Sequence, residues 1–95
     1  MKYKPRPGIV MTKICGTHFL IPTRPASVYC PHVLRLSFLT TVCWEMLAHE
    51  KSMEEIYNIY RILSRRTPEE SQDRVDRLFS DLYSKGFLIS AEDAS

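Results

Sequence analysis

Two short pairings of cysteine with histidine are the residues of this chain best suited to chemistry. Two residues separate Cys15 from His18, and one residue separates Cys30 from His32. Two thiolates and two imidazoles form a common ligand set for tetrahedral zinc. The one-residue gap is narrower than in standard zinc fingers, and an odd total of three cysteines argues against a disulfide framework. We therefore expect structural thiols without a metal or other cofactor, with a zinc site as the alternative.

No pattern typical of a catalytic site is found in the sequence. It contains three glycines, and it lacks a phosphate-binding loop, a G-x-S-x-G motif and an H-E-x-x-H motif. Glu54 and Glu55 are adjacent carboxylates, and neighbouring side chains on a helix point about 100° apart. Both are explained as first-turn acids beside a helix cap. The sequence therefore offers no candidate catalytic residue.

The charges are divided unevenly along the chain. Residues 1–36 carry six lysines and arginines and no acid, whereas residues 37–95 carry a net charge of −4, so the total is +2. A basic first part attracts an acidic partner, either a peptide or a phosphate. The alternative is that these cations are solvated side chains near a terminus.

Length and composition indicate one small domain over residues 1–95. The 44% hydrophobic and 25% charged shares are ordinary for a globular chain. No apolar run approaches the roughly 18 residues that cross a bilayer, and no signal-type segment follows the basic N-terminus. We expect a cytoplasmic protein without a membrane partner.

The first part of the chain predicts three short strands. Residues 9–14 and 17–21 are rich in β-branched and apolar types, and the Cys15-Gly16 pair between them suits a hairpin turn. A loop with three prolines follows over residues 22–31. Residues 32–36 predict a third strand, with Leu34 and Leu36 on one face. Residues 1–7 and 91–95 are expected to be flexible.

Three capping signals predict three helices in the second part. Ser37 suits an N-cap for a helix through Ala48, which carries an apolar stripe around Trp44. Ser52 and Glu55 form a capping box for a helix to about Arg65. Thr67 and Pro68 begin a third helix, which we expect to end before Gly86.

Strands followed by helices predict an α+β fold, winged helix-turn-helix-like, with a three-stranded antiparallel sheet followed by three helices. Such an order also suggests a nucleic-acid-binding winged helix, whose third helix would enter the major groove. The third helix here, residues 68–85, carries five acids and three cations. Phosphate would repel it, so we expect no nucleic acid, and DNA binding is the second hypothesis.

Several segments together resemble one family. They are the strand ending at Leu36 with its cap at Ser37, then Trp44 and Leu47, the run Ser52-Met-Glu-Glu-Ile56, and the closing Leu82-x-x-x-Gly86-Phe87-Leu88. From about Gly8 to Leu88, the chain resembles PqqD and the related peptide-recognition domains of pathways that modify ribosomally made peptides.

The resemblance implies a non-catalytic peptide chaperone. It would bind the leader segment of a precursor peptide and present it to a modifying enzyme such as a radical SAM protein, a cyclase or a leader peptidase. The peptide would add as a strand to the edge of the third strand and pack on the third helix. On this sequence the candidate peptide-binding residues are His32, Val33, Leu34, Arg35, Leu36, Arg74, Arg77, Leu78 and Asp81. Arg35 and Arg74 are candidates to pair with acids in the leader.

Overall fold

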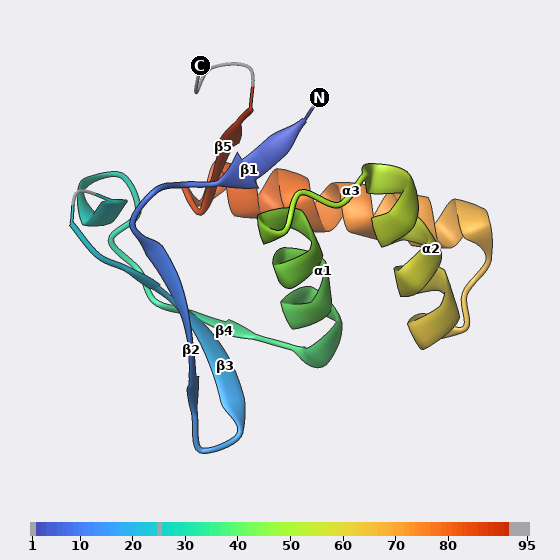
Figure 1. Ribbon diagram of the computed structural model, residues 1–95, viewed down its shortest axis with the longest axis horizontal. Coiled ribbons are helices and arrows are strands. Elements are labelled where there is room, and N and C mark those ends of the chain that lie inside the picture. The colour runs from blue at the N-terminus through green and yellow to red at the C-terminus, as the bar shows by residue number, and fades with distance from the viewer. Residues whose placement is uncertain (1, 25, 92–95) are drawn as a thin grey trace.

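The computed structural model describes residues 2–24 and 26–91. A three-stranded antiparallel sheet is followed by three helices, and a separate two-stranded sheet joins the two ends of the chain (Figure 1), which confirms the predicted α+β class. The strands are β1 (Tyr3–Pro5), β2 (Ile9–Ile14), β3 (Thr17–Pro22), β4 (Leu34–Leu36) and β5 (Leu88–Ser90). The helices are the 3-10 helix η1 (Ala26–Val28), α1 (Phe38–Ala48), α2 (Met53–Ser64) and α3 (Pro68–Ser84).

The larger sheet has the order β2-β3-β4, so β4 lies at one edge of it. β2 and β3 form the predicted hairpin, and Cys15 and Gly16 both adopt positive φ at its turn. Strand β4 begins two residues later than expected. Upstream of the strand, Cys30 is buried and its amide donates to the Ala26 carbonyl, and pairing with β3 covers only Leu34 to Leu36.

Within the segment 1–7, which was expected to be flexible, residues 3–5 form strand β1, and residue 1 lies outside the described residues. β1 pairs antiparallel with β5, and Tyr3 contacts the rings of Phe79 and Tyr83. The Arg6 Nε donates a 2.7 Å hydrogen bond to the Gly86 carbonyl. β1 has only three residues, one of them proline, so its sequence shows no local strand pattern. Its pairing partners in β5 lie more than 80 positions away. Of the tail expected to be flexible, residues 92–95 lie outside the described part.

The three α-helices begin directly after their predicted capping residues. The hydroxyls of Ser37, Ser52 and Thr67 each accept the amide of the residue three positions on, at 3.2–3.3 Å. Such bonds satisfy donors that a helix start leaves unpaired. Gly86 follows α3 with φ +94°, and a Cβ there would meet the Tyr29 carbonyl at 2.7 Å. Glycine is therefore required at this position both for conformation and for space.

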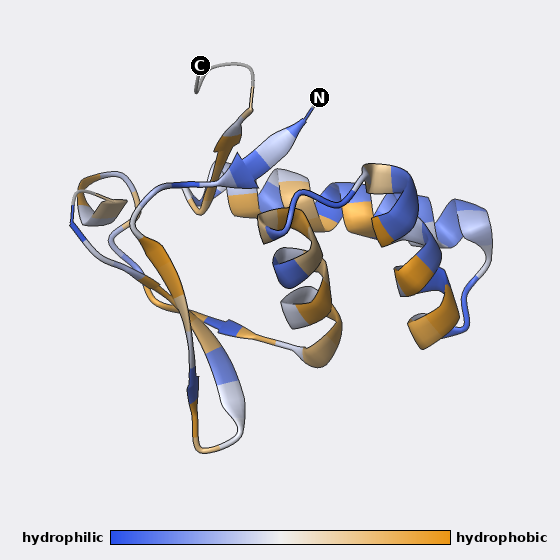
Figure 2. Cartoon of the chain, in the orientation of Figure 1, coloured by the Kyte–Doolittle hydropathy of each residue, from blue (hydrophilic) through white to orange (hydrophobic). Residues whose placement is uncertain are grey.

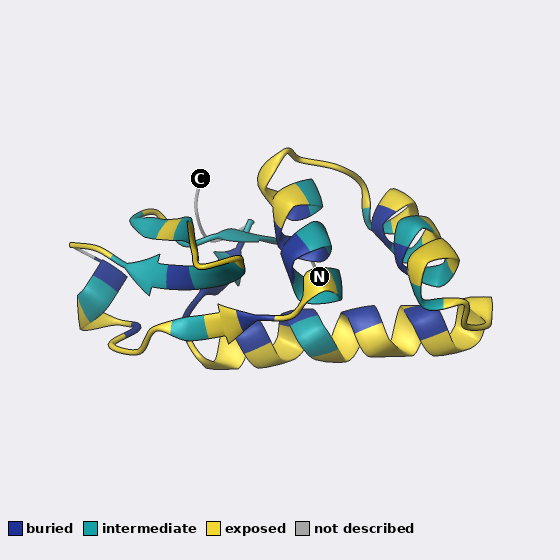
Figure 3. Ribbon diagram, turned by 90° about the horizontal axis from the view of Figure 1, so that it is seen from below, coloured by how far each residue is buried: buried dark blue, intermediate teal, exposed yellow. Residues whose placement is uncertain are grey.

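The core lies where the sheet, the helices and β5 meet. Trp44 is 4% exposed on α1, as predicted, and Cys43 beside it is buried. Burial raises the pKa of the Cys43 thiol to about 11, as expected for an inert core residue. Apolar residues recur along the helices in Figure 2, and buried positions recur along α3 among exposed ones in Figure 3. Phe38 on α1 and Leu63 on α2 are exposed apolar residues. Both stand at the ends of their helices.

Among the described residues, no helix is long and apolar enough to cross a membrane.

Candidate peptide-binding site

Most of the predicted strand residues 32–36 are exposed or half-buried, in β4 or just before it. Within the described residues β4 pairs only with β3, so its other side has no strand partner. Arg35 is exposed, Leu34 is half-buried and Leu36 is buried. His32 and Val33 precede the strand and are exposed. An unpaired strand offers backbone donors and acceptors to another chain.

The four predicted residues of α3 gather at one hollow of about 440 Å³. It is lined by Arg74, Arg77, Leu78 and Asp81 of α3, and by Ser37, Leu39, Thr40, Tyr60 and Asp73. No residue of the predicted strand segment 32–36 lines it. Ser37 does, directly after β4, so the hollow begins where the edge strand ends. We call it the α3 hollow.

Charges in the α3 hollow are partly neutralised by ion pairs along the helix. The Arg77 Nε lies 3.1 Å from the Asp73 carboxylate, and the Asp81 carboxylate lies 3.0 Å from the Lys85 ammonium. All four side chains are exposed, so each pair contributes little to stability. No ion pair within the described part of the chain involves Arg74. Of the predicted arginines on α3, Arg74 is therefore the better placed to bind a carboxylate.

A second hollow, of about 610 Å³, lies on the other side of Ser37. Its lining consists of Lys13, Gly16, Thr17, His18, Arg35, Leu36, Ser37 and Phe38. Three of these side chains are basic and none is acidic, so we call it the basic hollow. Neither Lys13 nor His18 was predicted to bind a peptide, and His18 was considered only as a zinc ligand. The predicted hairpin turn at Cys15-Gly16 could have grouped them, because it places Lys13 and His18 opposite each other on the two strands.

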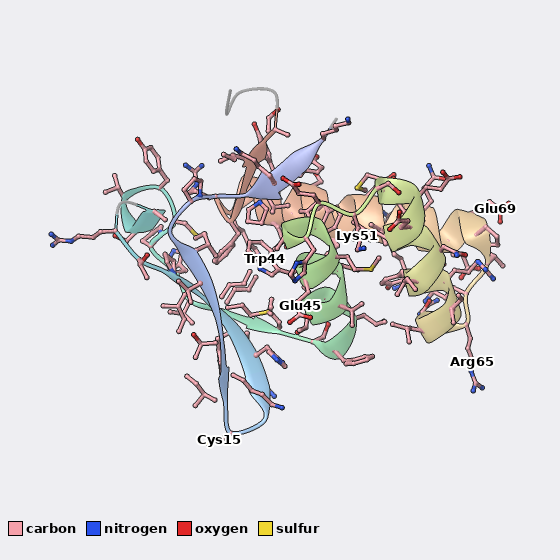
Figure 4. All side chains as sticks on the ribbon, viewed as in Figure 1. Cys15, Trp44, Glu45, Lys51, Arg65 and Glu69 are labelled. Carbon is pink, nitrogen blue, oxygen red and sulfur yellow. The ribbon has the colours of Figure 1, made fainter. Side chains whose placement is uncertain are left out.

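The four candidate zinc ligands do not gather. Cys15 lies at the hairpin turn, at one end of the molecule (Figure 4), whereas Cys30 is buried and its amide donates to the Ala26 carbonyl of η1. No group of three or more histidine, cysteine or acidic residues within residues 2–24 and 26–91 could hold a metal ion. Burial raises the pKa of the Cys30 thiol, against the opposing effects of a backbone hydrogen bond at His32 and the Arg6 charge. The protonated form is the poorer metal ligand.

A third hollow, of about 750 Å³, was not predicted. It lies between α2 and the start of α3 and is lined by polar side chains together with Tyr57 and Pro68. The Tyr57 hydroxyl donates a 2.5 Å hydrogen bond to Asp76 Oδ1 across the two helices. Burial, the bond to Asp76 and its charge raise the pKa of Tyr57 to about 12. Tyr57 and Asp76 are 19 positions apart, so no local sequence pattern predicted this contact.

No family model matches this chain, and no curated protein or solved structure matches it either. The likeness to PqqD-type domains therefore stays a prediction from the residues quoted above.

Proposed function

We propose that this chain is a non-catalytic peptide-recognition domain of the PqqD type. It binds the leader segment of a precursor peptide as a fourth strand on the free edge of β4. The observation that carries the proposal is the position of the α3 hollow, which begins at Ser37 where that edge ends. Backbone hydrogen bonds to β4 provide affinity, and the side chains around the hollow provide specificity.

The lining of the α3 hollow suits an extended peptide with mixed side chains. Leu78 and Leu39 offer apolar contact at its floor, and both are half-buried against the core. Arg74 offers a cation without an ion-pair partner in the described residues. Alternate side chains of an added strand point to the same face, so of the peptide residues that pass Ser37, every second one faces the hollow.

In this role the domain performs no chemistry. It holds the peptide in the cytoplasm in an extended form that a modifying enzyme accepts, such as a radical SAM protein, a cyclase or a leader peptidase. Because the peptide gains order before it meets that enzyme, less entropy is lost at the second binding step.

A selection from a random ten-residue peptide library displayed on mRNA tests the proposal. We expect the wild-type domain to enrich β-prone sequences with alternating apolar residues. Leu78→Trp fills the α3 hollow, and we expect it to abolish this enrichment. Asp81→Trp does the same from an exposed position of the lining, so at least one filling variant keeps the core intact.

Ser80→Trp is the matched control, because Ser80 is exposed on α3 and does not line the hollow. We expect it to select the same sequences as the wild type. Thermal melting of each variant shows that the fold is retained. The proposal fails if the wild type enriches nothing, or if the filling variants and the control behave alike.

A further inference from the structure

The three-stranded sheet has an outer face, turned away from the core, that the proposed function leaves unused. Successive side chains of a strand alternate between its two faces. Because Leu20 and Leu36 are buried in the core, the side chains that alternate with them point away from it. The rungs of this outer face are Val10 with Ile21, Thr12 with Phe19, and Ile14 with Thr17, and Arg35 of β4 lies opposite Phe19.

Four apolar side chains of the outer face lie outside the core. Val10 and Ile14 are 46% and 50% exposed, and Phe19 and Ile21 are half-buried. Among the described residues, none of the four belongs to the core cluster or packs against it, whereas Met11 on the other face of β2 does. Neighbouring apolar side chains that remain exposed are typical of an interaction surface.

The outer face carries one charged side chain, the cation of Arg35. It is exposed, and no ion pair among the described residues involves it. All eleven acids of the chain come after residue 36, so the segment that forms the sheet contains no carboxylate that could neutralise this charge. A partner that brings a carboxylate to Arg35 would gain a charge-assisted hydrogen bond.

The dimensions of the outer face suit one α-helix. Strands lie about 4.8 Å apart, so the β2–β3 hairpin is about 10 Å wide, close to the diameter of a helix with its side chains. The six residues of β2 span about 20 Å, the length of about 13 helical residues. A helix laid along the hairpin would cover the apolar rungs and turn one flank toward β4. An acid on that flank would meet Arg35.

We propose that the outer face of the sheet docks an amphipathic helix of a partner protein, whose apolar stripe is flanked by carboxylates. The inference goes beyond the peptide-binding role and does not depend on it, because β3 separates β2 from β4 and its free edge. A second copy of this chain fits the face poorly. Its exposed apolar helix residues, Ile62 and Leu63, adjoin Arg61, whose charge would repel Arg35.

An mRNA-displayed library of a three-helix-bundle scaffold with one randomised helix face tests the inference. We expect the wild-type domain to enrich scaffolds whose randomised face combines apolar residues with Asp or Glu. Val10→Glu/Ile14→Glu places two acids at exposed positions of the outer face, and fluorescence anisotropy should show at least about tenfold weaker binding of the enriched scaffolds. Ile14→Glu alone should show part of this loss. Arg35→Glu should weaken binding roughly three- to tenfold, and a selection on it should favour Lys and Arg.

Two control variants make the same chemical changes elsewhere on the surface. Ile62→Glu/Leu63→Glu replaces two exposed apolar residues of α2 and matches the double variant of β2. Lys51→Glu matches Arg35→Glu, since Lys51 is exposed and lies far from the hairpin turn that carries Cys15 (Figure 4). We expect the enriched scaffolds to bind both controls as they bind the wild type. Thermal melting of each variant shows that the fold is retained.

The outcome is separable from that of the proposed function. A short peptide selected for strand addition at β4 should bind Val10→Glu/Ile14→Glu as tightly as the wild type. An absence of enriched scaffolds, enriched faces without an excess of acids, or equal affinity for the outer-face and control variants would overturn the inference and leave strand addition intact. A dimer in analytical ultracentrifugation that Val10→Glu/Ile14→Glu abolishes would also overturn it, because a second copy would then cover the face.

Discussion

On α3, the guanidinium of Arg77 is paired with the carboxylate of Asp73, four residues before it. Arg74 lines the same hollow and has no ion pair among the described residues. The sequence presents these two arginines as equivalent candidates for binding acids. The structure distinguishes them, because Arg77 must leave Asp73 before it binds a peptide carboxylate, whereas Arg74 does not.

Charge reversal at the two arginines should therefore have unequal effects. We expect Arg74→Glu to weaken binding of a library-selected peptide by roughly five- to tenfold, and Arg77→Glu to weaken it less. Neither should lower the melting temperature by more than about a degree or two, since both side chains are exposed. Titration calorimetry beside a thermal scan measures both quantities. Equal losses of affinity, or a large drop in melting temperature, would contradict this account of α3.

Truncation of the core tryptophan should destabilise the domain strongly. Trp44→Ala removes a ring that is almost fully buried, and such changes cost about 3–5 kcal/mol. That is a large part of the stability of a domain of this size. Urea unfolding followed by far-ultraviolet circular dichroism gives the free energy. A loss below about 1 kcal/mol would show that α1 does not hold the core together.

Two glycines with positive φ should respond differently to alanine. At Gly16 an added Cβ meets nothing within 4 Å, so the cost is that of the backbone conformation, about 1 kcal/mol. At Gly86 the Cβ also collides with the Tyr29 carbonyl, and we expect Gly86→Ala to cost about 3 kcal/mol or more. Denaturant unfolding of both variants compares them directly. If the two substitutions cost the same free energy of unfolding, the segment of η1 and Tyr29 can move away from Gly86 without loss of stability.

Tyr57 should titrate later than an ordinary tyrosine. Its folded-state pKa of about 12 lies above the usual value of 10, so the protonated form is favoured by folding. The stability that this contact contributes is complete below pH 10 and is lost as the pH rises through about 12. Absorbance at 295 nm should show a late phase that Tyr57→Phe removes and Tyr29→Phe retains. If both variants keep the late phase, another residue accounts for it.

Local signals in the sequence predicted most of the fold. The caps at Ser37, Ser52 and Thr67 and the Cys15-Gly16 turn act over a few residues, and each lies where expected. The β1–β5 sheet escaped prediction, because its strands have three residues each and meet only through the finished fold. Short pairings of this kind are stabilised by tertiary contacts rather than by the propensity of either strand.

The part of the candidate site that lies on the single helix α3 was predictable from the sequence. Arg74, Arg77, Leu78 and Asp81 recur at three- and four-residue spacing, so they share a face of any helix that contains them. The contributions of Leu39, Thr40 and Tyr60 to the same hollow depend on how α1 and α2 pack on α3. A sequence contains no local pattern for that packing. The basic hollow likewise required the register of β3 with β4.

Amide hydrogen exchange on residues 33–37, measured by nuclear magnetic resonance with and without a library-selected peptide, tests strand addition most directly. We predict that one or more amides of β4 facing away from β3 exchange at least tenfold more slowly when the peptide is bound, while the hairpin turn is unchanged. Protection confined to other parts of the chain, with β4 exchanging as before, would contradict the account.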